Sequence, residues 1–459
     1  MLNFRKIDKQ DIKSIRPFLA STSRVCTKSI GVAYMWAEYM KTEIAPYDGG
    51  LIVKDTIMGK DVFLTPRVGD PAKAFPLIEE YVREKGGDLL FNSVDDEDLA
   101  LLASRYPAIE LKSYRDYSDY LYIASDLAEY KGKKYHGQKN HRNRFFKTYP
   151  NYEFLPFGKQ DLPEVFAFLE EHKAFAPRSQ NELTEYDCCV RLLQAMDELS
   201  LLTAMLRVDG KIIGISVGEV LNDTLIIHIE KALPTYSGAY PTICSLFAAM
   251  YGKDLTYINR EDDAGDAGLR TSKMQYKPVM LVEKRMAVCH LSKRLSLPTI
   301  FTERLVVDGF SSSDMASYAA LATDEERNRY WGYDYKADLN GDAPDAAHFE
   351  KVLTEDEARG VCYCRKIMQK SGAFVGEAVL YNFRVDGSAE LGLRITAAMA
   401  GKGYGREAYK AVADAALELL PRLHARCFKQ NEPSRKMILA AMFKQVGEDD
   451  EMLYFVRGK

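Results

Sequence analysis

One alternation of strands and helices recurs three times along the chain, and it limits the folds that the chain can adopt. The order is strand, helix, strand, helix, strand, and it is clearest over residues 224–288 and 389–457. A weaker copy lies within the first 125 residues, and a strand and a helix precede each copy. Such alternation favours mixed sheets with helices packed on their faces. We therefore predict an α/β (α+β) protein of three tandem units, each a mixed central sheet flanked by helices.

Two polar segments divide this pattern into its three parts. A basic run follows Tyr130, and residues 290–301, HLSKRLSLPTIF, are polar and contain a proline. A chain of 459 residues is long enough for two or three domains, each with its own core. We expect the units to span residues 1–125, 126–296 and 297–459.

Charge, apolar runs and cysteines exclude several classes of protein. The formal net charge is −4, so a surface that binds nucleic acid must be local. No run reaches the roughly 18 apolar residues of a membrane span, and the N-terminus lacks a signal-peptide core. Cys362 and Cys364 have no second pair at zinc spacing. We expect a cytoplasmic protein with reduced thiols, no metal and no integral membrane contact; the oligomeric state is not indicated.

Three glycines lie between an expected strand and an expected helix in the last third of the chain. They are Gly401, Gly403 and Gly405, within MAGKGYGREA. A junction of this kind lets backbone N–H groups approach a phosphate, and the helix dipole adds to the attraction. A plain glycine-rich turn is the alternative. The dinucleotide fingerprint is not met, because Arg406 occupies the position of its third glycine.

The last third of the chain resembles the GNAT acetyltransferases, especially those that acetylate the N-termini of ribosomal proteins. Their pyrophosphate loop is Q/R-x-x-G-x-G/A, which the sequence matches from Ala400 to Gly405 except at Ala400. The segments TERLVVDGFSSSDMASYAAL, AELGLRI and Asn431-x-x-Ser434 also resemble family segments. The resemblance covers about residues 298–459 and implies acetyl transfer from acetyl-CoA to a small-molecule or peptide amine. It assigns acetyl-CoA binding to Gly401, Lys402, Gly403, Tyr404, Gly405 and Asn431.

Two side chains are candidates for the proton transfers that this reaction needs. The amine loses a proton as it attacks, and the thiolate leaving group can take one up. Glu390 is the candidate base, directly or through a water, and a solvated carboxylate at a strand start is the alternative. Ser434 could donate to the sulfur, although as a helix N-cap it would need no function. Two departures from the family pattern leave open the alternative that this unit is degenerate. They are Ala400 in the glycine loop and AAMF in place of a KLGF-like helix end.

Residues 131–147, KGKKYHGQKNHRNRFFK, contain seven Lys/Arg, two His and no acid. Such a run can pair with the phosphates of RNA or with an anionic head group, or it can be a solvated face. This run and three later segments together resemble soluble relatives of the C-terminal catalytic domain of phosphatidylglycerol lysyltransferases. The three segments are HIEKALPTYSGAY, YINREDDAG and LRTSKMQYKP. This resemblance spans about residues 1–290. Those enzymes contain two GNAT-like folds and move an aminoacyl group from a charged tRNA to a lipid or peptide acceptor.

The resemblance implies aminoacyl-tRNA as a donor for the first two units. The junction Thr235–Tyr240 has one glycine, Gly238, beside the bulky Tyr236 and Tyr240, so a pyrophosphate would find few accessible N–H groups there. A tRNA donor would need phosphate contacts elsewhere. The basic run could supply them, and we assign them to Lys133, Lys134, Lys139, Arg142 and Arg144.

The stretch Tyr257–Tyr276, YINREDDAGDAGLRTSKMQY, is unusually rich in charge. A calcium loop is excluded by spacing, because Ala264 and Gly265 stand two residues after Asp262 and Asp263. A cationic amine could instead meet its carboxylates, and Arg270 could hold a carboxylate or phosphate bidentately. An arginine–acid network that only stiffens the turn is the alternative. The candidate substrate-binding residues are Glu230, Tyr240, Arg260, Glu261, Asp262, Asp263 and Arg270.

Two functions of different class follow from these patterns. The first is an acyltransferase that acetylates an amine through its last unit and transfers an aminoacyl group through the others. The second is a non-catalytic binding protein built from degenerate transferase folds.

Overall fold

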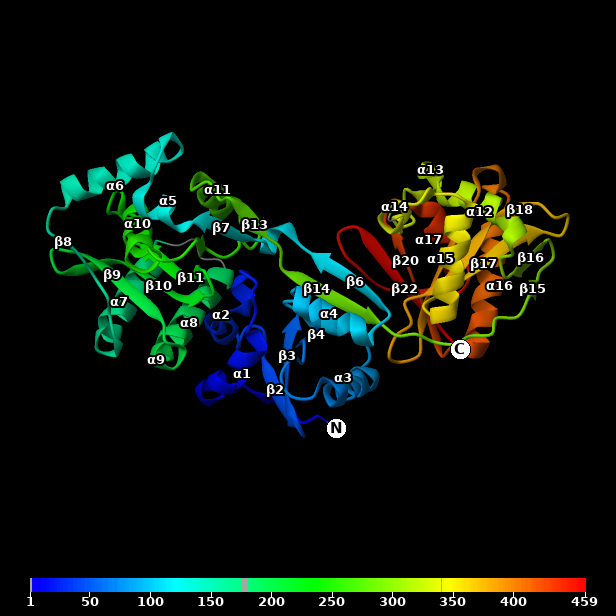
Figure 1. The fold of residues 1–459 in the computed structure, drawn as a ribbon, viewed down its shortest axis with the longest axis horizontal. Coiled ribbons are helices and arrows are strands. Elements are labelled where there is room, and N and C mark those ends of the chain that lie inside the picture. The colour runs from blue at the N-terminus through cyan, green and yellow to red at the C-terminus, as the bar shows by residue number, and fades with distance from the viewer. Residues whose placement is uncertain (1, 176–179, 340) are drawn as a thin grey trace. The chain divides into compact units, whose positions relative to one another are not determined.

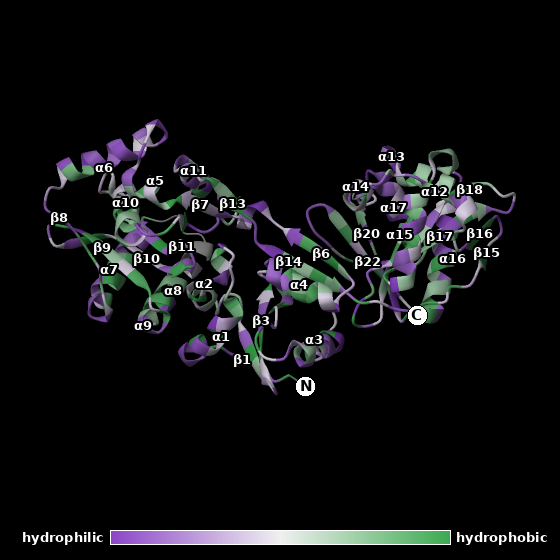
Figure 2. Ribbon diagram, in the orientation of Figure 1, coloured by the Kyte–Doolittle hydropathy of each residue, from purple (hydrophilic) through white to green (hydrophobic). Residues whose placement is uncertain are grey.

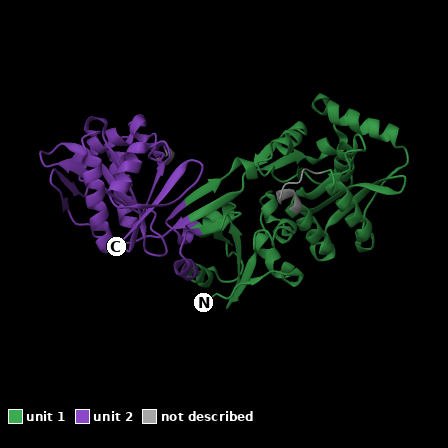
Figure 3. Ribbon diagram, turned by 180° about the vertical axis from the view of Figure 1, so that it is seen from behind, with its two compact units in different colours: residues 1–78, 90–102, 110–288 green, residues 79–89, 103–109, 289–459 purple. Residues whose placement is uncertain are grey.

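The computed structural model describes residues 2–175, 180–339 and 341–459. The chain forms two compact units (Figure 3). The first contains residues 1–78, 90–102 and 110–288, and the second contains residues 79–89, 103–109 and 289–459. The described residues form three mixed sheets flanked by helices, as the repeated pattern predicts (Figure 1). Among these residues no helix has both the length and the apolar character that crossing a membrane requires.

The first sheet is built mainly from the N-terminal part of the chain. Its strands, in spatial order, are β1 (Arg5–Lys6), β2 (Glu43–Tyr47), β3 (Gly50–Ile57), β4 (Lys60–Leu64), β5 (Leu89–Asn92), β14 (Arg285–His290) and β6 (Ala108–Ser113). The helices of this region are α1 (Ile12–Leu19), α2 (Ile30–Met35), α3 (Pro71–Lys85) and α4 (Asp96–Arg105). β4 and β5 are parallel neighbours, and α4 follows β5 directly.

The second sheet occupies the middle of the chain. Its spatial order is β13 (Met280–Val282), β7 (Asp119–Ile123), β12 (Tyr257–Asn259), β11 (Thr224–Ala232), β10 (Lys211–Leu221), β9 (Leu202–Val208) and β8 (Tyr152–Leu155). The helices are α5 (Ala124–Glu129), α6 (His136–Thr148), α7 (Leu162–Lys173), α8 (Gln180–Gln194), α9 (Met196–Leu199), α10 (Ala239–Tyr251) and α11 (Ala267–Gln275).

The first two sheets exchange a strand and share a core. The pattern predicts that the strand at 119–123 closes the first unit, but β7 pairs with β12 and β13 of the second sheet. In return β14, expected in the second unit, joins the first sheet. One apolar cluster combines Ile12 and Val53 with Leu192 and Ile229. The periodicity of the sequence predicted that these segments are strands. It carries no information on which strands become their neighbours in a sheet.

The third sheet contains the C-terminal strands. Their order is β15 (Ile300–Phe301), β16 (Leu305–Asp308), β17 (Cys362–Gln369), β18 (Phe374–Tyr381), β19 (Ala389–Ile395), β20 (Arg422–Phe428), β22 (Met452–Gly458) and β21 (Lys444–Glu448). The helices are α12 (Met315–Ala322), α13 (Glu325–Asn328), α14 (Tyr335–Asp338), α15 (Ala346–Arg359), α16 (Tyr404–Leu419) and α17 (Glu432–Ala440). On α16, Ala408, Val412 and Ala416 are buried at helical spacing, so this face packs on the sheet.

The second and third sheets each contain a parallel pair of strands that is hydrogen-bonded over only two or three residues. β11 pairs with β12 from Thr224–Tyr257 to Ile226–Asn259. β19 pairs with β20 only at Ala389–Leu423 and Glu390–His424. Beyond these positions the facing strand edges have backbone groups that must find partners other than the neighbouring strand.

Helix α6 packs on the junction between β11 and α10. Gly238 has a φ of 85°, and a Cβ at this position would lie 2.4 Å from the backbone oxygen of His141. Phe145 is fully buried, and the rings of Tyr149 and Tyr236 are 5.4 Å apart. The helix therefore covers the backbone at the position where the third sheet has its glycine loop.

We predict that Gly238→Ala destabilises the protein much more than Gly210→Ala. Both glycines have positive φ, but a Cβ on Gly210 meets nothing within 4 Å. Gly210→Ala should cost about 1 kcal/mol from backbone strain alone, and Gly238→Ala about 2 kcal/mol more because the His141 carbonyl must move. Equilibrium denaturation of both variants measures the difference. Equal costs would mean that α6 does not pack on Gly238.

Candidate functional site

The glycine loop of the third sheet leaves its backbone accessible. Gly401 and Gly403 have φ values of 76° and 81°, a conformation that side chains rarely adopt. A Cβ on Gly401 would meet nothing within 4 Å, whereas Gly405 packs against Met437 and Ile395. Gly403 precedes the first turn of α16, and no side chain caps this turn. The N–H groups at the start of α16 can therefore bind an anion.

A cation that the sequence analysis missed lies at this loop. Arg304, between β15 and β16, donates from Nη1 to the carbonyl oxygen of Lys402 at 3.0 Å and from Nε to Glu407 at 2.7 Å. Its guanidinium lies 4.6 Å from the centroid of the Tyr404 ring. Arg304 thus brings a guanidinium, paired with Glu407, to a loop where Ala400 supplies no cation. Arg304 belongs to the segment TERLVVDGFSSSDMASYAAL, which resembles the opening of the GNAT acetyltransferases. That resemblance was the only indication of Arg304 in the sequence.

Glu390 is buried and already has several partners. It accepts hydrogen bonds from the hydroxyl of Tyr381 at 2.8 Å and from Asn382 at 3.2 Å, and Arg426 lies 2.9 Å away. The alternative of a solvated carboxylate is therefore not what the structure shows. Burial, and then the charge of Glu390, raise the pKa of Tyr381 well above its usual value. The Tyr381 hydroxyl stays protonated and holds Glu390 in place.

Asn431, not Ser434, is the N-cap of α17. The side-chain oxygen of Asn431 accepts a hydrogen bond from the backbone N–H of Ser434 at 3.3 Å. The interpretation of Ser434 as an N-cap is therefore wrong, because the helix begins three residues earlier than that role requires. Its half-buried hydroxyl does not cap the helix.

In the second sheet, ion pairs span the place where β11 and β12 stop pairing. His228 of β11 lies 2.9 Å from Glu261 and 3.1 Å from Glu219. Two residues further along β11, Glu230 lies 2.6 Å from Arg260. The Arg260 guanidinium also lies 4.4 Å from the Tyr276 ring centroid. Side chains thus continue the connection between these two strands after their backbone bonds end.

The His228 imidazole is held as a cation between two carboxylates. Burial opposes its charge, but the hydrogen bonds with Glu219 and Glu261 outweigh burial and raise the pKa of His228 to about 9. The backbone N–H of Gly31 donates to Glu219 at 2.7 Å. A Cβ on Gly31 would lie 2.5 Å from both Glu219 and His228, so only glycine fits beside this triad.

Three further charged candidates of the acidic stretch, Asp262, Asp263 and Arg270, are also paired within the protein. Arg270 does hold a carboxylate bidentately, at 2.9 and 2.8 Å, but the carboxylate is that of Asp263 in its own loop. Asp263 is fully buried and also accepts from Tyr120 at 2.5 Å. Burial raises the pKa of Asp263, but these hydrogen bonds outweigh it and hold the pKa below its usual range. Asp262 lies 2.5 Å from Lys284. This geometry matches the alternative of a network that stiffens the turn.

Tyr240 lies at the start of α10 and is partly exposed. Its hydroxyl is 2.9 Å from Nε2 of His172, whose Nδ1 is 2.5 Å from the hydroxyl of Tyr186. Burial, and then Lys231, lower the pKa of His172 to about 4. A neutral imidazole therefore connects a partly exposed tyrosine to a buried one.

The predicted phosphate-binding residues separate into two groups. Lys133, Lys139 and Arg144 are exposed around the hydrophilic helix α6 (Figure 2). Lys134 is paired with Asp126 at 2.7 Å. Arg142 is the exception, because it donates to Ser245 at 2.6 Å and to the carbonyl oxygen of Ala128 at 3.1 Å. A basic run does not reveal which of its members turn inward, so nothing in the sequence indicated that the Arg142 guanidinium, assigned to a phosphate contact, is engaged within the protein.

The tandem GNAT-like sheets and the glycine loop define the architecture of a transferase. Residues 20–288 match the family described as Phosphatidylglycerol lysyltransferase, C-terminal, and the chain belongs to this family. Residues 304–444 match the family described as Acetyltransferase (GNAT) domain. The chain therefore joins two domain families of acyltransferase type.

Each of these known relatives resembles only part of the chain. A crystal structure of a conserved protein of unknown function from Bacteroides thetaiotaomicron is 30% identical, with a TM-score of 0.56, and covers 63% of this chain and 100% of that one. The uncharacterized protein MYCGA3080 of Mycoplasmoides gallisepticum is 28% identical over 175 residues, 36% of this chain. The match spans 54% of that curated relative, about half of its length. A GNAT-family acetyltransferase from Bacillus anthracis is 16% identical over 35% of this chain, with a TM-score of 0.30.

We predict that His228 makes stability depend on pH. A folded-state pKa of about 9 lies above the ordinary value of about 6.5, so the folded state binds the proton more tightly. This contribution is complete below about pH 6.5 and is lost as the pH rises through 9; it amounts to roughly 3 kcal/mol. Denaturation of wild type and His228→Gln between pH 6 and 10 measures it.

The variant His228→Gln should lose this pH dependence, whereas His136→Gln should keep it. His136 is exposed, so its replacement controls for the loss of an ordinary histidine. The same pH dependence in wild type and His228→Gln would contradict a buried imidazolium.

Proposed function

We propose that the C-terminal unit transfers an acetyl group from acetyl-CoA to a small-molecule or peptide amine. The observation that carries this proposal is the short pairing of β19 with β20 beside the uncapped start of α16. The free edge of β19 suits the amide groups of a pantetheine arm. The first turn of α16, together with Arg304, suits a pyrophosphate. The match of residues 304–444 to the GNAT domain family supports the same assignment.

The side chains near the strand opening can support amine attack on a thioester. As the amine nitrogen bonds to the acetyl carbon, it must lose a proton, and the carbon–sulfur bond breaks to release a thiolate. Glu390 already accepts hydrogen bonds from Tyr381 and Asn382, so we assign it proton removal through a water rather than by direct contact. Ser434 remains the candidate donor to the sulfur.

We predict that Gly401→Asp weakens coenzyme A binding at least about tenfold, because it adds a negative charge to the anion site. Gly59→Asp is the matched control: both glycines have a φ of 76° and open space around their Cβ positions, but Gly59 lies in the β3–β4 turn of the first sheet. Titration calorimetry with coenzyme A compares wild type and the two variants. Equal affinities for the three proteins would place the pyrophosphate elsewhere.

For the first two sheets, we infer transfer of an aminoacyl group from aminoacyl-tRNA to an acceptor. The family match over residues 20–288 supports this inference. Helix α6 covers Gly238, which leaves no open glycine loop at this junction. The exposed cations here are Lys139 and Arg144 of α6 and Lys133 in the turn before it. These cations suit the phosphates of a polynucleotide donor better than a single pyrophosphate.

We predict that replacing Lys133, Lys139 and Arg144 by glutamine weakens tRNA binding and reduces its salt dependence. Loss of three phosphate contacts should lower the slope of log K against log salt by about 2 to 3. Filter binding of aminoacyl-tRNA at several salt concentrations measures this slope. Glutamine replacement of the exposed Lys9, Lys13 and Lys41 is the control. An unchanged slope in the α6 variant would overturn the assignment.

A non-catalytic binding protein is the second candidate for these two sheets. The pairing of every charge at the end of β12 favours it, because Glu261, Asp262 and Asp263 all have partners within the protein. Consumption of aminoacyl-tRNA in the presence of acceptor mixtures would exclude this candidate. Binding of tRNA without consumption would support it.

A further inference from the structure

Two cavities in the first compact unit have Ser93 in common. The larger has a volume of about 370 Å³ and a polar lining that includes Ser23, Asp96, Glu97 and Glu283. The smaller has a volume of about 70 Å³ and is lined mostly by aliphatic side chains. These include Ile12, Ile15, Leu19, Ile30, Val53 and Leu64. A polar cavity and an apolar cavity therefore share one lining residue.

Ser93 lies where β5 ends and the chain turns toward α4. Its φ is 55° and its side chain is buried, with 4% exposed. The next residue, Val94, donates its N–H to the carbonyl oxygen of Arg285 at 3.0 Å. The turn is therefore fixed by β14, and the end of a strand that has a parallel neighbour is a frequent place for small-ligand sites.

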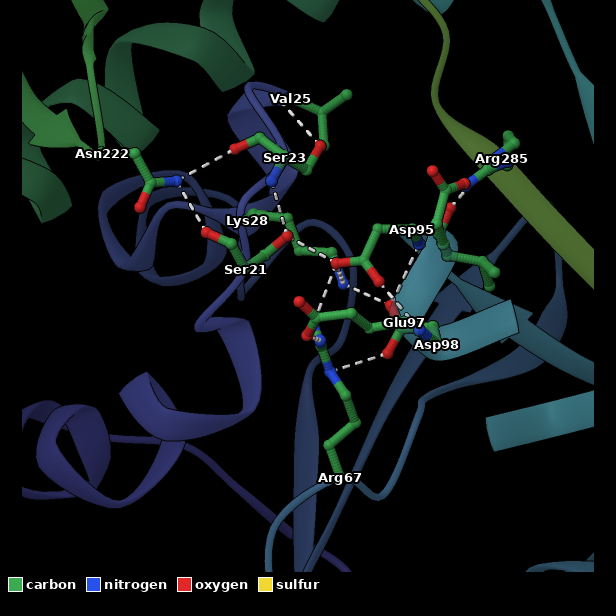
Figure 4. Close-up of polar contacts among 12 residues, drawn as sticks. Ser21, Ser23, Val25, Lys28, Arg67, Asp95, Glu97, Asp98, Asn222 and Arg285 are labelled. Atoms are coloured by element: carbon green, nitrogen blue, oxygen red, sulfur yellow. Dashed lines mark hydrogen bonds and ion pairs between the residues drawn. The ribbon is translucent and has the colours of Figure 1, made fainter. Parts of the chain in front are cut away.

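Asp95, which lines the larger cavity, belongs to a cluster of charged side chains that are paired with one another (Figure 4). Asp95 lies 2.9 Å from Arg67 and 3.4 Å from Lys28, and accepts from Ser21 at 2.5 Å. Lys28 is buried and also lies 2.5 Å from Asp98. Lys28 and Arg67 therefore balance the charges of Asp95 and Asp98.

The rim of the larger cavity has more acid than base. The ammonium of Lys284 is paired with Asp119 at 2.8 Å and with Asp262 at 2.5 Å. Arg285 binds Asp96 at 2.7 Å and the carbonyl oxygen of Val94. The carboxylates of Glu97 and Glu283 are exposed, and one oxygen of each is engaged, by Arg67 and by Ser113. The rim therefore attracts a cation.

The smaller cavity also has one polar group that lacks a partner. The buried hydroxyl oxygen of Thr27 has no hydrogen bond within the described residues. Asp55, which also lines this cavity, accepts from Thr42 at 2.6 Å, and burial raises its pKa to about 6. A volume of about 70 Å³ is roughly half that of a cavity that holds benzene, so it suits a short aliphatic group.

We propose that these two cavities form a binding site for a short aliphatic amine. The ammonium lies among Asp96, Glu97 and Glu283, and the aliphatic part passes Ser93 into the smaller cavity. This site shares no residue with the glycine loop or with α6, and it needs no acyl transfer in order to be detected.

Binding of small probes to the full chain tests the site. We expect n-butylammonium to bind at least about tenfold more tightly than n-butanol, and n-butyrate not to bind, in ligand-observed NMR titrations. Glu283→Gln should weaken n-butylammonium severalfold, and Glu80→Gln, an exposed change outside the site, should not. Equal binding of the amine and the alcohol would overturn the charge argument.

A second variant tests the apolar chamber. Ala33 lines the smaller cavity within α2, and Ala33→Leu should fill it. This variant should weaken n-butylammonium about tenfold and leave methylammonium unchanged, whereas Ala72→Leu on the exposed face of α3 should affect neither. If Ala33→Leu binds n-butylammonium like wild type, or if no probe binds wild type, the proposal is wrong.

Discussion

The short parallel pairing of β11 with β12, and of β19 with β20, is the constraint on which the rest of the structure depends. Two strands that separate after two or three paired residues leave backbone groups that need other partners. The third sheet leaves this opening beside a glycine loop. In the second sheet, the pairs His228–Glu261 and Glu230–Arg260 connect the strands instead. The third sheet therefore presents an open strand edge, whereas side chains close the corresponding edge in the second sheet.

Burial explains why the charges of the second sheet come as matched sets. A buried ion pair can contribute little net stability, but removing one partner leaves an uncompensated charge that costs several kcal/mol. Glu261 and Asp263 depend on His228 and Arg270 in this way. The acidic stretch, whose residues the sequence suggests as substrate contacts, thus forms ion pairs that stabilise the fold. With α6 over Gly238, this part of the fold differs from the third sheet both at the strand opening and at the strand–helix junction.

The sequence predicted the class of fold, because strand and helix periodicities are local properties. It also predicted the open glycine loop, since Gly401 and Gly403 need a backbone conformation that other residues avoid. It could not predict that β7 and β14 exchange sheets, because edge pairing depends on residues far apart in the chain. The inward turn of Arg142 and the position of Arg304 at the loop were missed for the same reason.

The central claim is that the open strand pair of the third sheet makes the C-terminal unit an N-acetyltransferase. Its most direct test is the release of free thiol from acetyl-CoA by the full chain, with and without a panel of small amines and peptides with free N-termini. The account predicts thiol release that depends on an amine and is matched by acetylation of that amine. Binding of acetyl-CoA with no amine-dependent release across the panel would contradict it and would favour a binding protein built on a transferase fold.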